Sequence, residues 1–322
     1  MHPISAPLAA FHPAQVRAGA FSIVMGLGGL SIAWQRVEAL FGLDPGFARG
    51  AAIAAACVFV LLAASYLVKV AVHPDALRKE FSDPAMLPFV GAIPISMEVL
   101  AVAFVNRQPA LAEWLLLGAL PLQIMVLGAM ARTWLGGEAL DPKAISPTWF
   151  IPCVGGVLVA LSGPQLGYTA LAWFFLGLGL MLWLFLMPIL LARLILLGPL
   201  PGPMRPALMI FLPPPTLGMV AYVTMTGQLD AFAIALFCFA LFMAAVLASM
   251  LPHLTAHRFS LSWWAFSFPT AALSGACSFI ASHTGVEPTR TLALASVSLC
   301  SMVILGLAAR TIVAIVRGEA LQ

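Results

Sequence analysis

Long apolar runs, broken by short clusters of charged residues, prolines and glycines, make up nearly the whole chain. A helix needs about 20 apolar residues to cross a bilayer, and these runs have that length. The pattern predicts ten membrane-spanning helices, near residues 19–40, 50–72, 87–105, 111–133, 148–163, 167–195, 206–227, 230–251, 262–283 and 290–316. We therefore expect one transmembrane domain at 19–317, between an N-terminal tail at 1–18 and a C-terminal tail at 318–322.

Composition supports an integral membrane protein. The chain has 322 residues, of which 62% are hydrophobic and only 8% are charged, and its mean hydropathy is +1.05. A soluble domain carries about a quarter charged residues, so this surface must face the lipid bilayer. The net charge of +3 gives no indication of nucleic acid as a partner.

Prolines recur at similar depth in alternate runs, and this spacing predicts an internal repeat. They are Pro94, Pro152, the triplet centred on Pro214, and Pro269, and the first run has glycines such as Gly26 in the same place. The interval equals two helices and two short loops. We interpret the chain as five helical hairpins repeated in parallel sense about an axis along the membrane normal.

Broken helices leave backbone groups unpaired, and lipid cannot satisfy them. The kinked odd-numbered helices are therefore expected inside, around a pore, with the even-numbered helices outside. The alternative is that each proline only kinks a packed helix. The candidate pore-lining residues are Ser22, Gly26, Pro94, Pro152, Pro214, Ser267 and Pro269, with further hydroxyls at Ser31, Ser96, Thr216 and Thr270.

Basic residues are distributed unevenly between the two sides that ten spans define. The side of the termini has eleven, namely Arg17, Lys69, Arg78, Lys79, Arg132, Lys143, Arg193, Arg205, Arg258, Arg310 and Arg317. The other side has four, namely Arg36, Arg49, Arg107 and Arg290. The positive-inside rule then predicts that both termini are cytoplasmic.

The odd-numbered runs have almost no charge in their middles, which argues against an acidic cation pore or a proton relay. Hydroxyls and amide dipoles instead favour the passage of an anion. Glu98, midway in the third run, is the exception. It is a candidate proton-coupling carboxylate, or else an acid that lies off the axis between helices.

Few features of the sequence indicate a function other than transport. The five cysteines lie in apolar runs without a Cys-x-x-Cys pair, so we expect no metal site and no cofactor. The chain has no HExxH motif and no nucleophile–base pair in these runs, so we do not expect an enzyme. In the stretch WWAFSFP, Trp263 and Trp264 are typical of an aromatic belt at the membrane interface.

Four stretches, in order, carry a resemblance over about 19–317. They are GLGGLSIAW in the first run, EFSDP…PFVGAIP before and within the third, SPTWFIPCVGG at the fifth and WWAFSFPTAAL at the ninth. In these the chain resembles the TehA-type tellurite-resistance/C4-dicarboxylate transporter family, which includes the plant guard-cell slow anion channels. Ser146 and the Ser82–Asp83–Pro84 stretch depart from the family's pattern, and Glu98 is not part of it.

The resemblance implies a ten-helix protomer with quasi-fivefold symmetry, assembled as a homotrimer with one pore in each protomer, in a bacterial inner membrane. It also implies that a phenylalanine of the ninth helix closes the pore. Phe268 matches that position, whereas Phe266 would point about 200° away on a helix. The residues alone favour a packing ring of the helix bundle, or a member of the aromatic belt, for Phe268, and it is the resemblance that favours the gate.

Two functions follow as expectations. The first is a passive channel for small monovalent anions such as chloride and nitrate. The alternative is a proton-coupled carrier of C4-dicarboxylates such as malate, or an exporter of tellurite or other oxyanions. The chain has no paired basic residues in mid-membrane to bind a dicarboxylate, which favours the channel.

Overall fold

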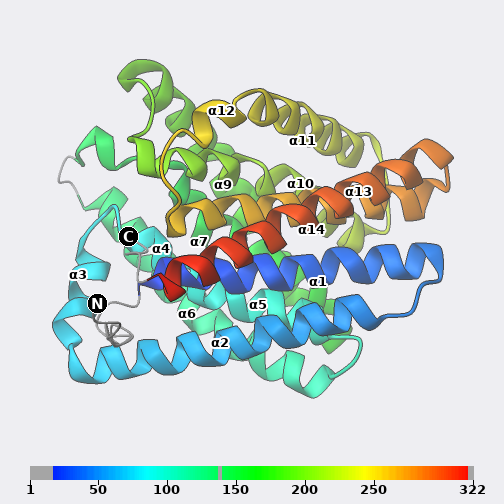
Figure 1. Ribbon diagram of the computed structural model, residues 1–322, viewed down its shortest axis with the longest axis horizontal. Helices are drawn as coiled ribbons and strands as arrows, with labels where there is room; N and C mark the ends of the chain where they lie inside the picture. The colour runs from blue at the N-terminus through cyan, green and yellow to red at the C-terminus, as the bar shows by residue number, and fades with distance from the viewer. Residues whose placement is uncertain (1–16, 137–139, 318–322) are drawn as a thin grey trace, which may run out of the picture.

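The computed structural model of the protein describes residues 17–136 and 140–317. Within these residues every regular element is a helix, and no strand is assigned. Apart from residues 17 and 18, the two predicted tails lie outside the described residues. Helix α1 (Ser22–Phe41) starts and helix α14 (Glu287–Val316) ends at one end of the molecule, which we call the terminal face (Figure 1). The opposite face carries the turns at 42–45, 105–108, 163–168, 227–230 and 285–286.

Nine segments of the described chain are helical, long and apolar enough to cross a membrane, as expected for an all-helical membrane protein. They are Ala18–Phe41, Gly46–Val72, Leu87–Phe104, Pro109–Leu135, Thr169–Leu197, Gly202–Thr226, Ala231–Ser249, Leu261–Thr284 and Glu287–Val316. The predicted fifth span is a shorter apolar helix, Pro147–Ser162. At the rise of an α-helix its 16 residues extend about 24 Å, less than the hydrocarbon thickness of about 30 Å.

Odd-numbered and even-numbered segments are built differently. Each odd segment joins a short first piece to an α-helix: η2 (Ala18–Phe21) to α1, α4 (Leu87–Val90) to α5 (Ala92–Phe104), η4 (Pro147–Trp149) to α7 (Phe150–Gly155), η7 (Gly202–Phe211) to α10 (Pro213–Thr226), and η8 (Leu261–Phe266) to α13 (Ser267–Thr284). In the fifth segment, η5 (Gly156–Leu158) and α8 (Val159–Ser162) follow α7. The even segments are single long helices: α2 (Gly46–Val72), α6 (Pro109–Leu135), α9 (Thr169–Leu197), α11 (Ala231–Ser249) and α14.

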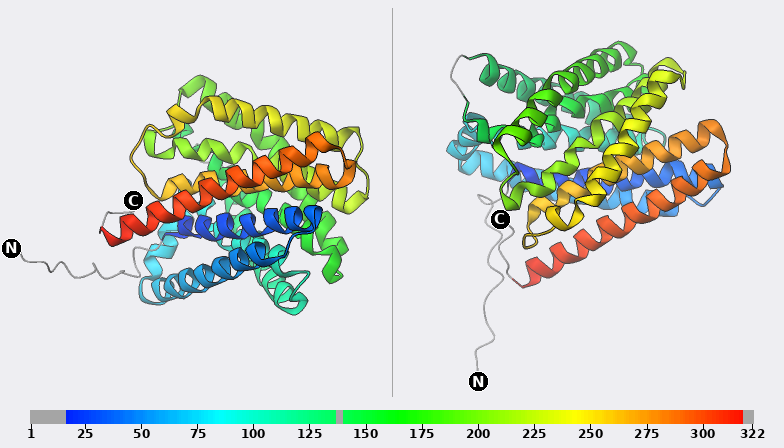
Figure 2. Two further views of the ribbon diagram at one scale, coloured as in Figure 1. Left: turned by 45° about the vertical axis from the view of Figure 1, so that its right-hand side comes forward. Right: turned by 90° about the horizontal axis from the view of Figure 1, so that it is seen from above.

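Burial alternates along the chain in the same sense. In the first, third, seventh and ninth segments, 56%, 83%, 78% and 72% of the residues in the most apolar stretch are buried. In α2, α6, α9, α11 and α14 the corresponding shares are 17%, 33%, 22%, 28% and 28%. The odd segments therefore form an inner layer and the even helices an outer layer, and the long helices run roughly side by side in all views (Figures 1 and 2).

The inner segments contact one another in a closed order. Helix α1 packs on α5, α5 packs on α7 and η5, α10 packs on α8 and η5, α13 packs on α10, and α13 also packs on α1. Each outer helix covers its neighbour in sequence: α2 covers α1, α6 covers α5, α9 covers α7 and α8, α11 covers α10, and α14 covers α13. The five inner segments thus adjoin in the order of the chain, and the last meets the first.

The repeated prolines lie just after the breaks in the inner segments. Pro94 is the third residue of α5, Pro152 of α7, Pro215 of α10 and Pro269 of α13. The first four N–H groups of an α-helix have no partner within the helix, so a proline here removes no hydrogen bond. In each of these four segments the break falls at the start of the α-helix, in the turn before the proline, where the proline ring clashes with the carbonyl of a continuous helix.

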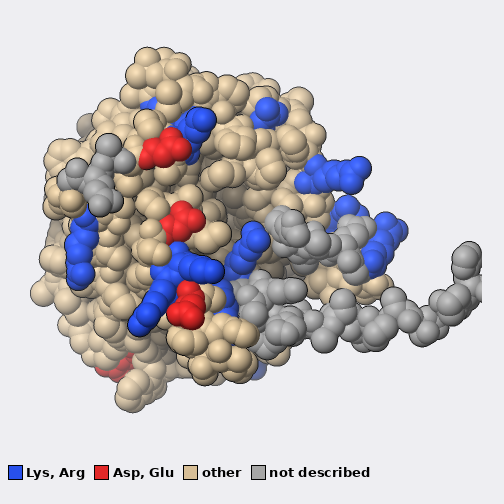
Figure 3. All heavy atoms as spheres, turned by 90° about the vertical axis from the view of Figure 1, so that its left-hand side faces the viewer, with Lys and Arg blue, Asp and Glu red and all other residues tan. Residues whose placement is uncertain are grey.

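Short helices connect the segments near the two faces: α3 (Pro74–Ser82), η3 (Pro142–Ala144), η6 (Pro164–Leu166) and α12 (Leu251–Leu254). On the terminal face, α3 is attached to α2 by an ion pair in which Lys69 Nζ lies 2.6 Å from Glu80 Oε1. Tyr66 donates a second hydrogen bond of 2.6 Å to Glu80. Figure 3 shows this face, where lysines and arginines surround a depression.

Candidate functional site

Phe268 lies in the first turn of α13, where α13 packs against α1. Its ring is half-buried, although the residues on either side of it, Ser267 and Pro269, are buried. The ring faces Gly29 of α1, since a Cβ atom at Gly29 would lie 3.4 Å from Phe268 Cδ2 and 2.9 Å from the Cβ of Ala271. No pattern in the sequence pairs Phe268 with a partner, although the Gly26–Leu27–Gly28–Gly29 run indicates a helix surface that a second helix can approach closely.

Gly26, one turn before Gly29, brings the two helices closer still. A Cβ atom there would lie 2.4 Å from Ser267 Oγ and 2.6 Å from Ser267 Cβ, distances that exclude any side chain without a shift. Two predicted site residues, Gly26 and Ser267, are therefore in direct contact. Together with Gly29 and Phe268 they form the contact between the first and the last inner helix.

The aromatic residues before Phe268 have different surroundings. Phe266 is 6% exposed and packs near Trp263, with 6.1 Å between the ring centroids. Trp264 is 1% exposed, and its Nε1 donates a hydrogen bond of 3.0 Å to Thr311 of α14. The prediction that Trp264 anchors the membrane interface is wrong, because the indole spans the contact between two helices. Trp263 is half-buried and lies against Phe259.

Most of the predicted lining residues are enclosed. Gly26, Pro94, Pro152, Pro214, Ser267 and Pro269 are buried, and Ser22 is half-buried. The buried hydroxyls donate to backbone carbonyls: Ser267 to Trp264 at 2.6 Å, Ser96 to Ala92 at 2.7 Å, and Thr216 to Pro213 at 2.9 Å. Their first role is therefore to satisfy backbone groups where the inner segments change from one helical form to another. Their assignment to a pore lining stays a prediction.

Glu98 lies in α5 with no exposed surface. Neither carboxylate oxygen has a hydrogen-bond partner among the described residues. Gly91 lies two turns earlier on the same side of the helix and packs against Pro152 of α7. Glu98 therefore points to the contact between neighbouring inner segments. A charge in this place would cost several kcal/mol without a partner.

The opposite face has a second cluster on α1 and α13. The guanidinium of Arg36 lies over the ring of Phe279, with 5.0 Å from Cζ to the centroid. The imidazole of His283 stacks on the same ring, with 4.2 Å between the centroids. Beside this cluster, Arg290 lies 4.8 Å over the ring of Phe41.

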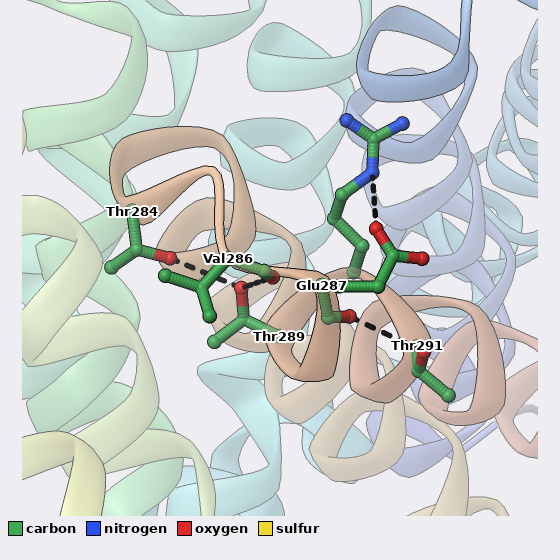
Figure 4. A network of polar contacts seen from close by, with 6 residues as sticks. Thr284, Val286, Glu287, Thr289 and Thr291 are labelled. Atoms are coloured by element: carbon green, nitrogen blue, oxygen red, sulfur yellow. Dashed lines mark hydrogen bonds and ion pairs between the residues drawn. The ribbon is translucent and has the colours of Figure 1, made fainter.

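The turn from α13 to α14 has its own polar contacts (Figure 4). Thr284 and Thr289 share a hydrogen bond of 3.0 Å, and Thr289 also donates to the carbonyl of Val286. Glu287 lies 3.9 Å from the Nε of Arg290. A hollow of about 440 Å³ opens on the same face, lined by Gln35, Glu38, Ala39, Gly42, Leu43, Pro45, Asn106 and Arg107.

Among residues 17–136 and 140–317, no group of three or more His, Cys, Asp or Glu side chains could hold a metal ion. The buried cysteines Cys153, Cys277 and Cys300 are free thiols. The described chain is an arrangement of long apolar helices around an inner layer rich in small residues and prolines. A polytopic all-helical membrane protein is the class that the fold defines.

The comparison with known proteins identifies the family within this class. Residues 15–312 match the family described as voltage-dependent anion channel (SLAC1), and the chain belongs to this family. The resemblance found in the sequence motifs is therefore confirmed. Relatives of the chain include proteins named as S-type anion channels and as transporters.

Individual relatives have low sequence identity to the chain, but the matches cover most of its length. The tellurite resistance protein TehA homolog of Haemophilus influenzae is 26% identical over 265 residues, which cover 81% of this chain and 80% of the relative. The guard cell S-type anion channel SLAC1 of Arabidopsis thaliana is 26% identical over 246 residues, covering 74% of this chain and 44% of the relative. The S-type anion channel SLAH3 of the same plant is 25% identical, covering 80% of this chain and 41% of the relative. The chain thus spans less than half of these two plant channels.

Proposed function

We propose that the protein is a passive channel for small monovalent anions, such as chloride and nitrate, and that Phe268 closes its pore at rest. The pore runs between the five inner segments, which repeat with quasi-fivefold symmetry. The observation that carries the proposal is the ring of Phe268, which is half-buried in the inner layer and faces Gly29 of α1. Membership of an anion-channel family supports it.

The physical reason is the cost of removing water from an ion. A ring across a narrow apolar passage excludes water, and a partly dehydrated anion then meets a barrier of several kcal/mol. Turning the ring away from its rotamer costs only about 0.5–1.5 kcal/mol. A small conformational change therefore suffices to open the passage.

The assembly and placement follow from the same proposal. We expect a homotrimer with one pore in each protomer, in a bacterial inner membrane with both termini in the cytoplasm. The excess of basic residues on the terminal face supports this orientation. These charges also raise the local concentration of anions at the cytoplasmic mouth.

Ion-substitution electrophysiology in oocytes or planar bilayers tests the gate. Phe268→Ala should raise the chloride or nitrate current at least tenfold, since removing about 1.4 kcal/mol of barrier has that effect. Phe242→Ala is the matched control, because Phe242 is 61% exposed on the outer helix α11. Equal currents in the wild type and Phe268→Ala would refute the gate.

A second candidate function is a proton-coupled carrier of malate or related dicarboxylates, or an exporter of tellurite or other oxyanions. The observation that favours it is Glu98, whose two oxygens are buried without a partner in the described chain. Such a carboxyl group is suited to taking up and releasing a proton during transport. The name of the TehA homolog connects that relative with tellurite resistance.

Proteoliposomes separate the two candidates. A carrier takes up malate in proportion to an imposed proton gradient, and Glu98→Gln abolishes that uptake. A channel passes chloride and nitrate without a gradient of protons, and Glu98→Gln leaves this flux intact. Proton-dependent malate uptake that Glu98→Gln removes would replace the channel by the carrier.

A further inference from the structure

Arg36 occupies an unusual place for an arginine. It belongs to α1, an inner helix, and its side chain is half-buried near the opposite face. Its recorded contact is the ring of Phe279, at 5.0 Å. In the part of the chain that the structure describes, no carboxylate lies within ion-pair distance of the guanidinium, and no hydrogen bond of its N–H groups is formed.

The acidic residues of the opposite face are engaged with other groups. Glu38 accepts a hydrogen bond of 2.9 Å from the backbone N–H of Ala48 through Oε1, while its Oε2 is buried without a partner among the described residues. Glu113 accepts from Tyr168 at 2.6 Å, and this bond raises the pKa of the Tyr168 hydroxyl.

Two further acids on this face are also engaged, and a third is exposed to solvent. Asp230 accepts from the backbone N–H of Ala233, which holds its pKa below the usual range. Glu287 lies beside Arg290, and Asp44 is exposed in the turn after α1. The charge of Arg36 is therefore available to a ligand.

Helix geometry places Arg36 and Phe268 on one stripe of the α1–α13 contact. Arg36 follows Gly29 by seven residues and Phe279 follows Phe268 by eleven, so each pair lies within about 20° on its helix. Along the helix axes, Arg36 lies about 10 Å from Gly29, and Phe279 lies about 16 Å from Phe268. The extended side chain of Arg36 spans the difference between these two distances. The contact of Arg36 with Phe279 is therefore equivalent to that of Gly29 with Phe268, but it lies closer to the opposite face.

We propose that Arg36, held over Phe279 beside His283, forms a binding site for small inorganic anions at the mouth of the pore on the opposite face. The inference rests on the proposed channel function, because it assigns the side that carries Phe268 to the pore. An unpaired guanidinium presents five N–H donors to an anion. Phe279 holds the cation by a cation–π contact that leaves these donors free.

The site concentrates anions at a mouth that otherwise has few basic residues. A unit charge about 6 Å away in water raises the local concentration of a monovalent anion about threefold. The effect extends about 30 Å at 10 mM salt and about 3 Å at 1 M salt. The contribution of Arg36 to anion flux is therefore large in dilute solution and absent in concentrated solution.

Single-channel conductance in the Phe268→Ala background tests the site with chloride as the probe. Adding Arg36→Gln should lower the conductance about threefold at 10 mM chloride and leave it unchanged at 1 M. Arg36→Lys keeps the charge and should keep most of the conductance. Arg107→Gln is the matched control, because Arg107 is exposed on the same face and lies off this stripe, at the end of α5. A conductance that Arg36→Gln leaves unchanged at 10 mM, or lowers equally at both concentrations, would overturn the inference.

A binding measurement distinguishes failure of the site from failure of the channel. If Phe268→Ala conducts no anion, the proposed channel is refuted. Thermal unfolding of the purified full chain then shows whether Arg36 binds an anion. At constant ionic strength, replacing gluconate by nitrate should raise the unfolding temperature of the wild type and of Arg107→Gln. The shift should be absent in Arg36→Gln. Equal shifts in Arg36→Gln and wild type would rule the site out.

Discussion

Gly26 shows how one position without a side chain positions the residues around it. Ser267 occupies the space that a Cβ atom would need, and the ring of Trp264 comes within 3.2 Å of the same point. Since α1 and α13 are the first and the last inner helices, this close contact is where the chain closes its inner layer. The register of Phe268 against Gly29 depends on it.

Gly26→Ala should therefore destabilise the protein. Overpacking of this kind costs about 1–3 kcal/mol, because two backbones must move apart. Gly128→Ala is the control, since Gly128 lies on the exposed side of α6 and a Cβ atom there meets nothing within 4 Å. Equilibrium unfolding in mixed detergent measures the free energy of unfolding of both variants. A Gly26→Ala variant as stable as Gly128→Ala would contradict the close contact of α1 with α13.

Single residues were the least predictable part of the site. In the sequence, Trp264 is typical of an anchor at the membrane interface. In the structure it donates a hydrogen bond to Thr311, which lies 47 positions away on another helix. No local pattern contains that hydrogen bond. Phe268 is assigned to the gate by resemblance to a family, because the residues alone favour a packing ring. Its contact with Gly29 required the tertiary structure.

At the scale of elements, four inner segments share one design. A short first piece ends, an α-helix begins, and its third residue is a proline. The recurrence at one depth was visible in the sequence because the proline spacing equals one hairpin. The position of the break relative to the proline was not, because hydrophobic periodicity does not distinguish a 3₁₀ turn from the first turn of an α-helix.

Proline substitutions in α13 test this design. Pro269→Ala should cost less than about 1 kcal/mol, since the lost rigidity concerns mainly the unfolded chain and no helical hydrogen bond changes. Ala276→Pro places a proline at the tenth, buried residue of the same helix and should cost about 3 kcal/mol or more. Unfolding measurements that rank the two variants in the reverse order would contradict the position of Pro269 in the first turn of α13.

At the scale of the whole molecule, charge and hydropathy predicted the spans well, because lipid imposes a simple rule on their length and polarity. The alternation of inner and outer segments was predicted from the need to cover broken backbone. The fifth segment, expected at 148–163, has the same short length in the structure, where it is the helix Pro147–Ser162.

Cysteine labelling tests the lipid-facing surface and the orientation. Cys57 of α2 and Cys238 of α11 are exposed on outer helices, and a charged maleimide should not label them in membranes. In spheroplasts the reagent should label Gln228→Cys from outside, on the opposite face. Arg78→Cys, on the terminal face, should react only after permeabilisation. The reverse order would place the termini outside the cell.

The alternation of layers also bears on how the chain enters the membrane during synthesis. In three of the four hairpins whose two helices are both long enough to compare, the outer helix is the more hydrophobic, and in the other the two are equal. Each inner segment leaves the ribosome immediately before its outer partner. Since a weakly apolar helix with a broken backbone partitions poorly into lipid alone, the translocon should release the pair together. The hairpin is then the unit of biogenesis, with the second helix of each pair carrying the first into the bilayer.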